Sequence, residues 1–413
     1  MLRFVAADLK RHWIGVAAVA LLIALATALG VAVTLGERAL RLGSAHAAGA
    51  FDLVVGAPGS ETQLLLSAVF LQAAPLTLMP GNVLAGLIRD ERVAWAAPVG
   101  FGDFVEDFPI VGTTQALVDG LGGVSEGRTF EKLGEALVGA SVAKNMGSRF
   151  HPAHGQVRQA TAMHNDVTYA VVGRLRPTGT AWDRAVIVPI EAVWHIHERD
   201  RAGTGSPLLQ AAAQGAAETS EFDQPIHPEA VLDPSTPGLP AIVVKPRTVA
   251  DAYKLRQAHR NDRTVAIFPG EVLTRLYGTL GDARRVLSLV AGGAQALVAA
   301  AILLVVVLHV MQRRRQIGAL RAFGAPRAVV FEIVWLETFA IIAAGVLLGF
   351  GLGYTAARTG AHLLSGASGF TLPVEFRSED WQSALVLLAI TGLIALVPSM
   401  LAYRQSPAQA LRN

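Results

Sequence analysis

The sequence predicts an α-helical membrane protein with four transmembrane helices and one large α+β domain outside the membrane. Three observations support this fold class: long apolar runs, a soluble stretch of mixed strand and helix pattern between the first two runs, and arginines at the ends of the runs. With 52% hydrophobic and 16% charged residues, the chain is too apolar for an ordinary soluble protein and too mixed to lie wholly in lipid.

The charge balance and the lack of cysteine exclude several classes of function. The formal net charge is +3, from 35 basic and 32 acidic residues, so we expect no nucleic-acid partner and interpret the basic residues near the apolar runs as topology signals. With 0 cysteines, disulfides, thiol catalysis, Cys-ligated zinc and iron–sulfur clusters are excluded. We expect no cofactor.

The N-terminal region predicts a membrane anchor. Residues 1–12 combine basic and apolar side chains in the pattern of an amphipathic helix on the cytoplasmic surface. Residues 13–35 form the first predicted span, which is long enough to cross a bilayer. A cleaved signal peptide is the alternative, but its apolar core would be about 7–15 residues long. We therefore expect an uncleaved anchor whose N-terminus is cytoplasmic.

Residues 36–268 are the predicted extracytoplasmic α+β domain, because no other spanning run occurs there. Strand Phe51–Val55 is followed by a helix at Ser60–Phe70, and strand Ala241–Lys245 by a helix at Thr248–Ala258. These two similar units could form one lobe that a central block interrupts. Further strands are expected at Val93–Val99, Phe104–Val111, Thr168–Arg174, Ala185–Pro189 and Thr264–Phe268, and further helices at Gly81–Asp90 and Gly134–Met146.

One stretch of this domain lacks a sustained period. Residues 199–240 are rich in Ala, Gly, Gln, Glu, Ser and Pro, and we interpret them as a long insertion loop. Such a loop is either a dispensable solvated segment, which costs little stability, or a binding element for an extracytoplasmic partner or cargo.

A long helix is predicted to return the chain to the membrane. Residues 269–285 are expected to form a stalk and residues 286–312 the second span. The apolar stripe of the stalk consists of Leu273, Leu276, Tyr277 and Leu280. Three arginines end the span and hold that end on the cytoplasmic side: Arg313, Arg314 and Arg315.

Residues 313–327 predict a short cytoplasmic helix. Ile317, Leu320 and Phe323 are spaced three residues apart and share a face, and Gly324 is a natural end for the helix. Pro326 suits the first turn of the next helix.

The remaining elements complete the predicted membrane region. The third span is expected at 328–357, an outer loop at 358–381, the fourth span at 382–403 and a cytoplasmic tail at 404–413. The third span carries small residues that allow close helix contact: Gly345, Gly349, Gly351 and Gly353.

The residue pattern of the C-terminal third resembles that of a known family. The stretch RRRQIGALRAFGAPRAVV at 313–330, the Leu336-Glu337 pair, and the ending with Pro398, Ala402, Pro407, Ala410, Leu411 and Arg412 resemble the MacB/FtsX/LolC family of ABC-transporter permeases. Within the soluble stretch, residues 134–147 and 171–189 resemble short sequence patterns of the same family, but less closely. The resemblance implies a MacB-like periplasmic core of two lobes, a multi-pass chain in the bacterial cytoplasmic (inner) membrane, and coupling by mechanotransmission.

The resemblance also implies partners. The short helix would dock on a cytoplasmic ABC ATPase through Ile317, Gly318, Ala319, Leu320, Arg321, Ala322, Phe323 and Gly324. A second permease subunit would complete a homo- or heterodimer, and a periplasmic adaptor or substrate-binding protein is a further candidate partner. The chain has no G-x-x-x-x-G-K-[ST] phosphate loop. It departs here from MacB, which carries its own ATPase, so we expect a separate ATPase subunit and no catalytic activity in this chain.

Other chemistry has little support. We expect no Ser/His/Asp hydrolase. His151 and His154, and His195 and His197, are close pairs and weak metal candidates, but HIH follows a probable helix, on which residues two apart do not share a face. We interpret these side chains as solvated loop histidines and expect no metal.

Several roles remain open within this frame. Lipoprotein or lipid handling and MacB-like efflux or secretion are both compatible with the sequence, whereas an FtsX-like division regulator has a much smaller outer domain. The alternative from another class is a membrane-anchored signalling or scaffold protein that regulates an extracytoplasmic partner without transport.

Overall fold

The computed structural model describes residues 2–72, 74–156, 159–163, 167–203, 222–233, 235–279 and 324–404, with the single residues 281, 293 and 300. The chain divides into two compact units. The first holds Met1–Arg41, Gly281–Leu364 and Leu372–Asn413, and the second holds Leu42–Leu280 with the short segment Ser365–Thr371. The predicted second span at 286–312 and the predicted coupling helix up to Phe323 lie outside the described residues, apart from two single positions of the span.

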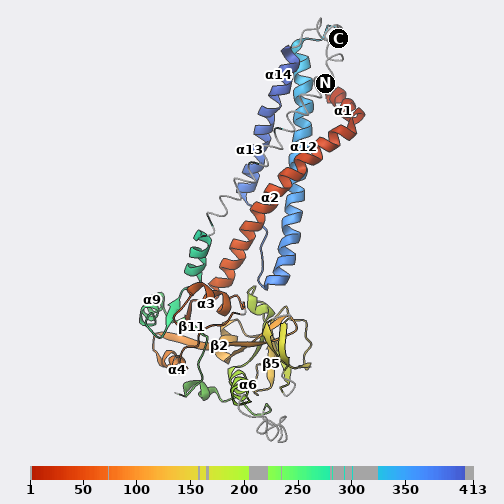
Figure 1. Ribbon diagram of the computed structural model, residues 1–413. Coiled ribbons are helices and arrows are strands. Elements are labelled where there is room, and N and C mark those ends of the chain that lie inside the picture. Colours follow the sequence, from red (N-terminus) through yellow and green to blue (C-terminus); the bar gives the residue numbers. More distant parts are fainter. Residues whose placement is uncertain are drawn as a thin grey trace. The chain divides into compact units, whose positions relative to one another are not determined.

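The first unit is helical (Figure 1). Its described elements are α1 (Leu2–Arg11), α2 (Trp13–Gly49), α12 (Arg327–Ser368), α13 (Ser378–Ile394) and α14 (Leu396–Arg404). By length and composition, two of the described helices could cross a membrane: Trp13–Gly49, with a mean hydropathy of 2.7, and Arg327–Gly366, with 2.1. Side chains along both are exposed although they are large and apolar, among them Leu21, Leu25, Leu347 and Leu352.

The helices run further than the predicted spans. Helix α2 continues beyond 35 to Gly49, and α12 continues beyond 357 to Ser368. Neither extension contains a proline, and α12 ends where Gly369 adopts φ +82° and its N–H bonds the carbonyl of Ser365. The region of the predicted fourth span is divided into α13 and α14 at Ala395. Pro398 follows in the first turn of α14, where a missing N–H is tolerated.

The second unit is an α+β domain built on a twelve-stranded sheet within the described residues. The strand order is β12-β1-β11-β2-β3-β10-β5-β9-β4, with β6, β7 and β8 at its side. The strands are β1 (Leu53–Gly56), β2 (Val93–Val105), β3 (Phe108–Thr113), β4 (Val124–Gly127), β5 (Glu135–Val138), β6 (Arg149–Phe150), β7 (Ala153–Gln156), β8 (Gln159–Met163), β9 (Tyr169–Leu175), β10 (Val186–Pro189), β11 (Ala241–Pro246) and β12 (Val265–Ile267). The helices are α3 (Glu61–Ala68), α4 (Asn82–Arg89), α5 (Gln115–Gly120), α6 (Ile190–Gly203) and α9 (Val249–Ala258), with 3-10 turns η1 (Ala181–Arg184) and η2 (Pro228–Leu232).

Strands from the two ends of the domain lie side by side, as the sequence predicts. Strand β1 pairs antiparallel with β11, with Val54 opposite Val243, and β12 pairs with β1 on the other side. Ser60 caps α3, since its hydroxyl accepts from the N–H of Gln63 at 3.2 Å. The two strands predicted at Val93–Val99 and Phe104–Val111 have other bounds in the structure. The first, β2, is 13 residues long and continues to Val105.

Strand β2 joins the two parts of the sheet. Its first half pairs with β11, from Trp95 to Val99, and its second half pairs with β3, with Val105 opposite Phe108. The register shifts between Gly100 and Asp103, where such an irregularity re-aims a strand.

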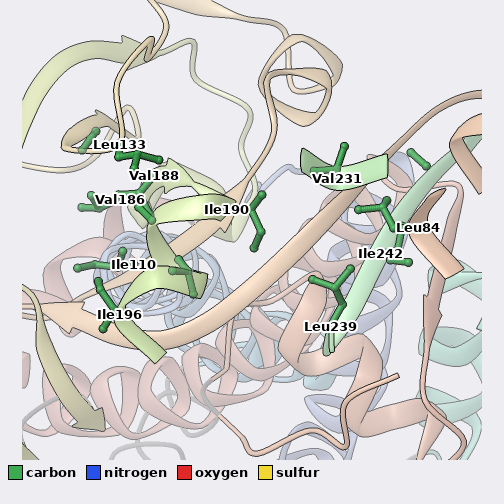
Figure 2. Packing of buried hydrophobic residues seen from close by; sticks show 14 of the residues in the cluster. Leu84, Ile110, Leu133, Val186, Val188, Ile190, Ile196, Val231, Leu239 and Ile242 are labelled. Atoms are coloured by element: carbon green, nitrogen blue, oxygen red, sulfur yellow. The ribbon is translucent and has the colours of Figure 1, made fainter. Parts of the chain in front are cut away.

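Both faces of the sheet are buried, because side chains alternate along each strand. Leu53, Val186 and Ile242 belong to one core cluster, which α4 and α6 cover, and Figure 2 shows part of it. Val54 and Ile187 point to the other face, where α3 and α5 pack. The end of α2 and the helix at 269–279 also pack on this second face, as shown below.

The predicted helix at Gly134–Met146 is wrong. Residues 135–138 form β5, and all four side chains are buried. This strand pairs with β10 on one side and with β9 on the other. Its place inside the sheet therefore overrides the helical spacing of its apolar residues.

The interpretation of 199–240 as a structureless insertion is also wrong where the chain is described. Helix α6 extends to Gly203, and 222–233 and 235–240 are folded into the domain. Phe222 is 7% exposed and Leu239 is 0% exposed. The carbonyl of Phe222 accepts from Gly134 N at 2.7 Å, and Met79 and Leu239 exchange backbone hydrogen bonds. Residues 204–221 and 234 lie outside the described part.

Candidate functional site

Only the C-terminal end of the predicted coupling stretch lies within the described residues. Arg313, Arg314, Arg315 and the predicted docking residues from Ile317 to Phe323 lie outside the described residues. Gly324 has φ +93°, the left-handed conformation that commonly ends a helix and that favours glycine. Helix α12 begins three residues later, and the carbonyl of Pro326 accepts from the N–H groups of Val329 and Val330. A turn therefore connects the coupling stretch directly to α12.

Helix α12 packs against α2 through a stripe of glycines, which we call the glycine seam: Gly345, Gly349 and Gly353. A Cβ atom on each would lie 2.7–2.8 Å from a carbonyl oxygen of α2, at Ala20, Ala24 and Ala28 respectively. Only glycine permits such close approach of two helix backbones. Gly351, which the sequence also suggested, faces open space.

Helix α13 is held to α2 by a polar contact. The Arg38 guanidinium donates to both carboxylate oxygens of Asp380, at 2.7 and 3.0 Å. The two side chains are only 11% and 10% exposed. Asp380 also accepts from Arg377 N at 2.8 Å, in the first turn of α13. This bidentate geometry is the strongest form of a carboxylate–guanidinium pair.

A second contact joins α13 to α12. The indole N–H of Trp335 donates to the carbonyl of Gly392 at 3.0 Å, and its ring stacks on Phe339 at 5.2 Å. A Cβ at Gly392 would make only ordinary van der Waals contact with Phe339, at 3.8 Å, so this arrangement does not depend on glycine there.

The predicted stalk residues begin inside the domain. Leu273 is 6% exposed and packs in the second core cluster, with Tyr277 against its edge. The Tyr277 hydroxyl lies 2.7 Å from the hydroxyl of Ser44 on α2. Leu276 is half-buried, and Leu280 lies outside the described residues. The first part of the stalk is therefore an element of the domain core.

Ion pairs fix the base of this helix to its neighbours. Glu271 accepts from Arg256 of α9 at 2.6 Å and from Arg275 at 2.9 Å, and Arg275 also reaches Glu61 of α3 at 2.9 Å. Hydrogen bonds from Arg256 hold the pKa of the Glu271 carboxyl below its usual range.

The four candidate histidines are distributed over separate elements. His151 lies 2.8 Å from the carbonyl of Val167 through Nδ1, and His154 is in β7. His195 and His197 lie on α6, on either side of the buried Ile196. Within the described part of the chain, no group of three His, Asp or Glu residues could hold a metal ion.

Two contacts were missed by reasoning from the sequence. Arg38 and Asp380 are separated by 342 positions, so no local pattern relates them. The available signal was a charged residue just beyond an apolar run, matched by an acidic residue at the start of another. The second contact involves Asp183, a buried carboxylate described below. In the sequence it stood out only as part of the stretch 171–189, which weakly resembles the family pattern.

Comparisons with known proteins agree with the apolar helices and the glycine-rich packing of this region. Residues 288–407 match the model of the FtsX-like permease C-terminal domain. Among curated proteins, none matches the chain by sequence.

Solved structures similar to the chain include two extracytoplasmic domains. The periplasmic region of MacB from Actinobacillus actinomycetemcomitans has 10% identity and a TM-score of 0.32, over 55% of this chain and 95% of that one. The extracellular domain of the noncanonic ABC-type transporter YknZ from Gram-positive bacteria has 11% identity and a TM-score of 0.27, over 52% of this chain and 98% of that one.

The matched family region contains the IGALRAFG stretch, the glycine seam and the start of the C-terminal pattern. The first and the last of these carry the resemblance noted in the sequence. Residues 288–407 are therefore similar to the C-terminal domain of FtsX-like permeases, in agreement with the MacB/FtsX-type resemblance of the sequence.

Proposed function

We propose that this chain is the permease subunit of an ABC transporter that works by mechanotransmission. In this proposal a partner ATPase hydrolyses ATP in the cytoplasm. The chain converts the closure of that ATPase into movement of the α+β domain outside the membrane. The observation that carries the proposal is the family match over 288–407, which includes the predicted coupling stretch and the helix that follows it.

The contacts of the outer domain support this mechanism. Three segments connect the domain to the helices: the end of α2, the helix at 269–279 and the connection between α12 and α13. Each packs on the second core cluster or on its edge, through residues such as Phe51, Leu273 and Phe370. Buried connections transmit displacement, whereas solvated linkers would absorb it.

The proposed topology has four spans, with both termini and 313–327 in the cytoplasm and the α+β domain outside the inner membrane. Substrate would be handled at the domain or the outer leaflet, in efflux, secretion or lipoprotein and lipid handling. The chain would act as a dimer, with each copy bound to one ATPase.

Docking of the ATPase is tested by mutation of the apolar face of the coupling stretch. The double variant Leu320→Asp with Phe323→Asp should insert in the membrane but lose the ATPase during purification in mild detergent, because an exposed apolar helix face needs a partner groove. The control Val249→Asp with Leu363→Asp places two charges at exposed apolar positions outside the coupling stretch, 76% and 70% exposed, and should retain the ATPase. Retention of the ATPase by the double variant would disprove the docking assignment.

Topology is tested in the cysteine-free background. Ser220→Cys should react with a thiol reagent that cannot cross the membrane, and Ser406→Cys should react only after the membrane is opened. The opposite labelling pattern would overturn the proposed orientation. A chain that purifies without any ATPase would instead favour a signalling or scaffold role.

A further inference from the structure

The connection between α12 and α13 is held firmly by the α+β domain. Residues Ser365–Thr371 belong to the same compact unit as the domain. Phe370 is 8% exposed, and its ring meets Phe70 edge to face at 5.6 Å. This segment is therefore anchored, although the sequence suggested a plain outer loop.

The partner of this connection is one turn of the domain, residues 178–184, which we call the 178–184 turn. Thr371 N donates to the carbonyl of Gly179 at 3.2 Å, and the Arg184 guanidinium donates to the carbonyl of Gly366. Gly369 adopts φ +82° beside the turn, and a Cβ there would lie 3.3 Å from the Cα of Ala181. Polar and steric contacts thus fix the connection at several points.

The 178–184 turn is itself rigid. The carboxylate of Asp183 is buried and accepts from Thr178 N, Thr178 Oγ1 and Gly179 N, each at 2.8 Å. The carbonyl of Asp183 accepts from Ser141 N at 2.8 Å, just beyond β5. The chain then continues into β10. A displacement of this turn must therefore reach β5 and β10 in the centre of the sheet.

The same turn also contacts the end of α2. Trp182 is 0% exposed, and its ring lies 6.0 Å from that of Phe51, which follows α2 directly. A Cβ at Gly179 would lie 3.4 Å from the His46 ring on α2. Two separate connections to the membrane helices thus meet on one short turn, with Trp182 facing one and Arg184 facing the other.

We propose that the 178–184 turn is the joint through which movement of the end of α2 and of the α12–α13 connection is passed to the sheet of the outer domain. Arg184 and Phe370 are positioning residues that keep the connection engaged with the turn. This inference rests on the proposed function and deepens it, because it specifies a route into the domain that is separate from the stalk helix.

The test uses the full chain, copurified with its ATPase and reconstituted in lipid nanodiscs. Hydrogen exchange of peptides that cover β5 and β10 is compared without nucleotide and with ATP and vanadate. The wild-type complex should show a nucleotide-dependent change in exchange. The variant Arg184→Gln with Phe370→Ala should keep ATPase binding and vanadate trapping but lose most of that change.

Two further variants separate coupling from simple loss of structure. Arg184→Lys, which keeps a cationic donor, should retain the nucleotide-dependent change. The control Arg358→Gln with Leu363→Ala alters the exposed end of α12, where Leu363 is 70% exposed, and should leave the change intact. If the double variant melts early, the single variant Phe370→Leu, which preserves apolar volume, is used with the same readout and should show a partial loss.

The outcomes distinguish the inference from the function on which it rests. If the wild-type complex binds no ATPase, or its domain does not respond to nucleotide, the proposed function fails and the inference fails with it. If the wild type responds and the folded double variant responds equally, the joint is disproved while the proposed function stands. A loss of response with normal ATPase trapping supports the joint.

Discussion

Helices α12 and α13 both lie against α2, but they are held to it by opposite kinds of contact. Helix α12 uses the glycine seam, where the glycines lie directly against the backbone of α2 and no ion pair is involved. Helix α13 uses the Arg38–Asp380 ion pair, one bidentate contact of two nearly buried charges. The seam depends on shape along several turns, whereas the ion pair depends on one geometry at one point.

This difference shows how a helix bundle can combine a fixed contact with a releasable one. Close packing over three helical turns loses many dispersion contacts at once if it opens, so α2 and α12 are expected to move as one body. An ion pair is either made or broken, and water can solvate both charges once they part. We therefore expect α13 to separate from α2 more readily than α12 does.

The largest effect should come from filling the glycine seam. In Gly349→Leu the new Cβ would lie 2.5 Å from the Thr27 Cβ and 2.7 Å from the Ala24 carbonyl, so the helices must move apart. We expect a loss of about 3 kcal/mol or failure to accumulate, because backbone cannot yield as a side chain can. The thermal unfolding midpoint of the purified protein measures this.

Gly351→Leu is the matched control, two residues away on the same helix. Nothing lies within 4 Å of a Cβ at Gly351, so this variant should unfold at the wild-type temperature. Equal damage from both substitutions would mean that helix propensity or lipid contact matters here, and not the seam.

A smaller effect is expected from breaking the ion pair. Arg38→Ala leaves the Asp380 carboxylate without its strongest partner, and we expect a loss of about 2 kcal/mol. Glu379→Gln is the control, since this neighbour is 71% exposed and 3.8 Å from Arg38. A double-mutant cycle with Asp380→Asn isolates the coupling between the two charges. Additive effects of the two single changes would show that the pair contributes no stability.

The contrast between these contacts also explains what could be predicted from the sequence. The small-residue spacing of Gly345, Gly349 and Gly353 indicated close helix packing, because a helix repeats every few residues and places them on one face. The strand–helix units of the domain, α3 after β1 and α9 after β11, followed from equally local patterns.

What failed were features decided by distant parts of the chain. Residues 135–138 have a helical spacing but are drawn into the sheet by β10 and β9. Phe222 lies in a polar stretch, yet its ring packs in the first core cluster, 6.1 Å from that of Tyr169. The partners of Arg38 and of the 178–184 turn were invisible for the same reason, since tertiary contacts carry no local signature.

The smallest expected effect concerns a second bidentate pair, Arg128 with Glu135, which provides the same chemistry in the α+β domain. Burial alone would raise the pKa of Glu135, but hydrogen bonds from Arg128 and from the N–H groups of Glu131 and Lys132 outweigh it and lower the pKa. A carboxyl with a lowered folded pKa stabilises the protein above its unfolded pKa of about 4.3. That contribution is lost as the pH falls through the lower, folded pKa.

The stability difference between wild type and Glu135→Gln should therefore be largest, about 1–2 kcal/mol, near neutral pH and shrink below about pH 4. Unfolding midpoints at a series of pH values measure it, with Glu131→Gln as the control because that side chain is 70% exposed. A difference that does not vary with pH would mean that Glu135 acts through shape and not through charge. The Arg38–Asp380 contribution would then also need to be measured by charge reversal before it could be assigned to electrostatics.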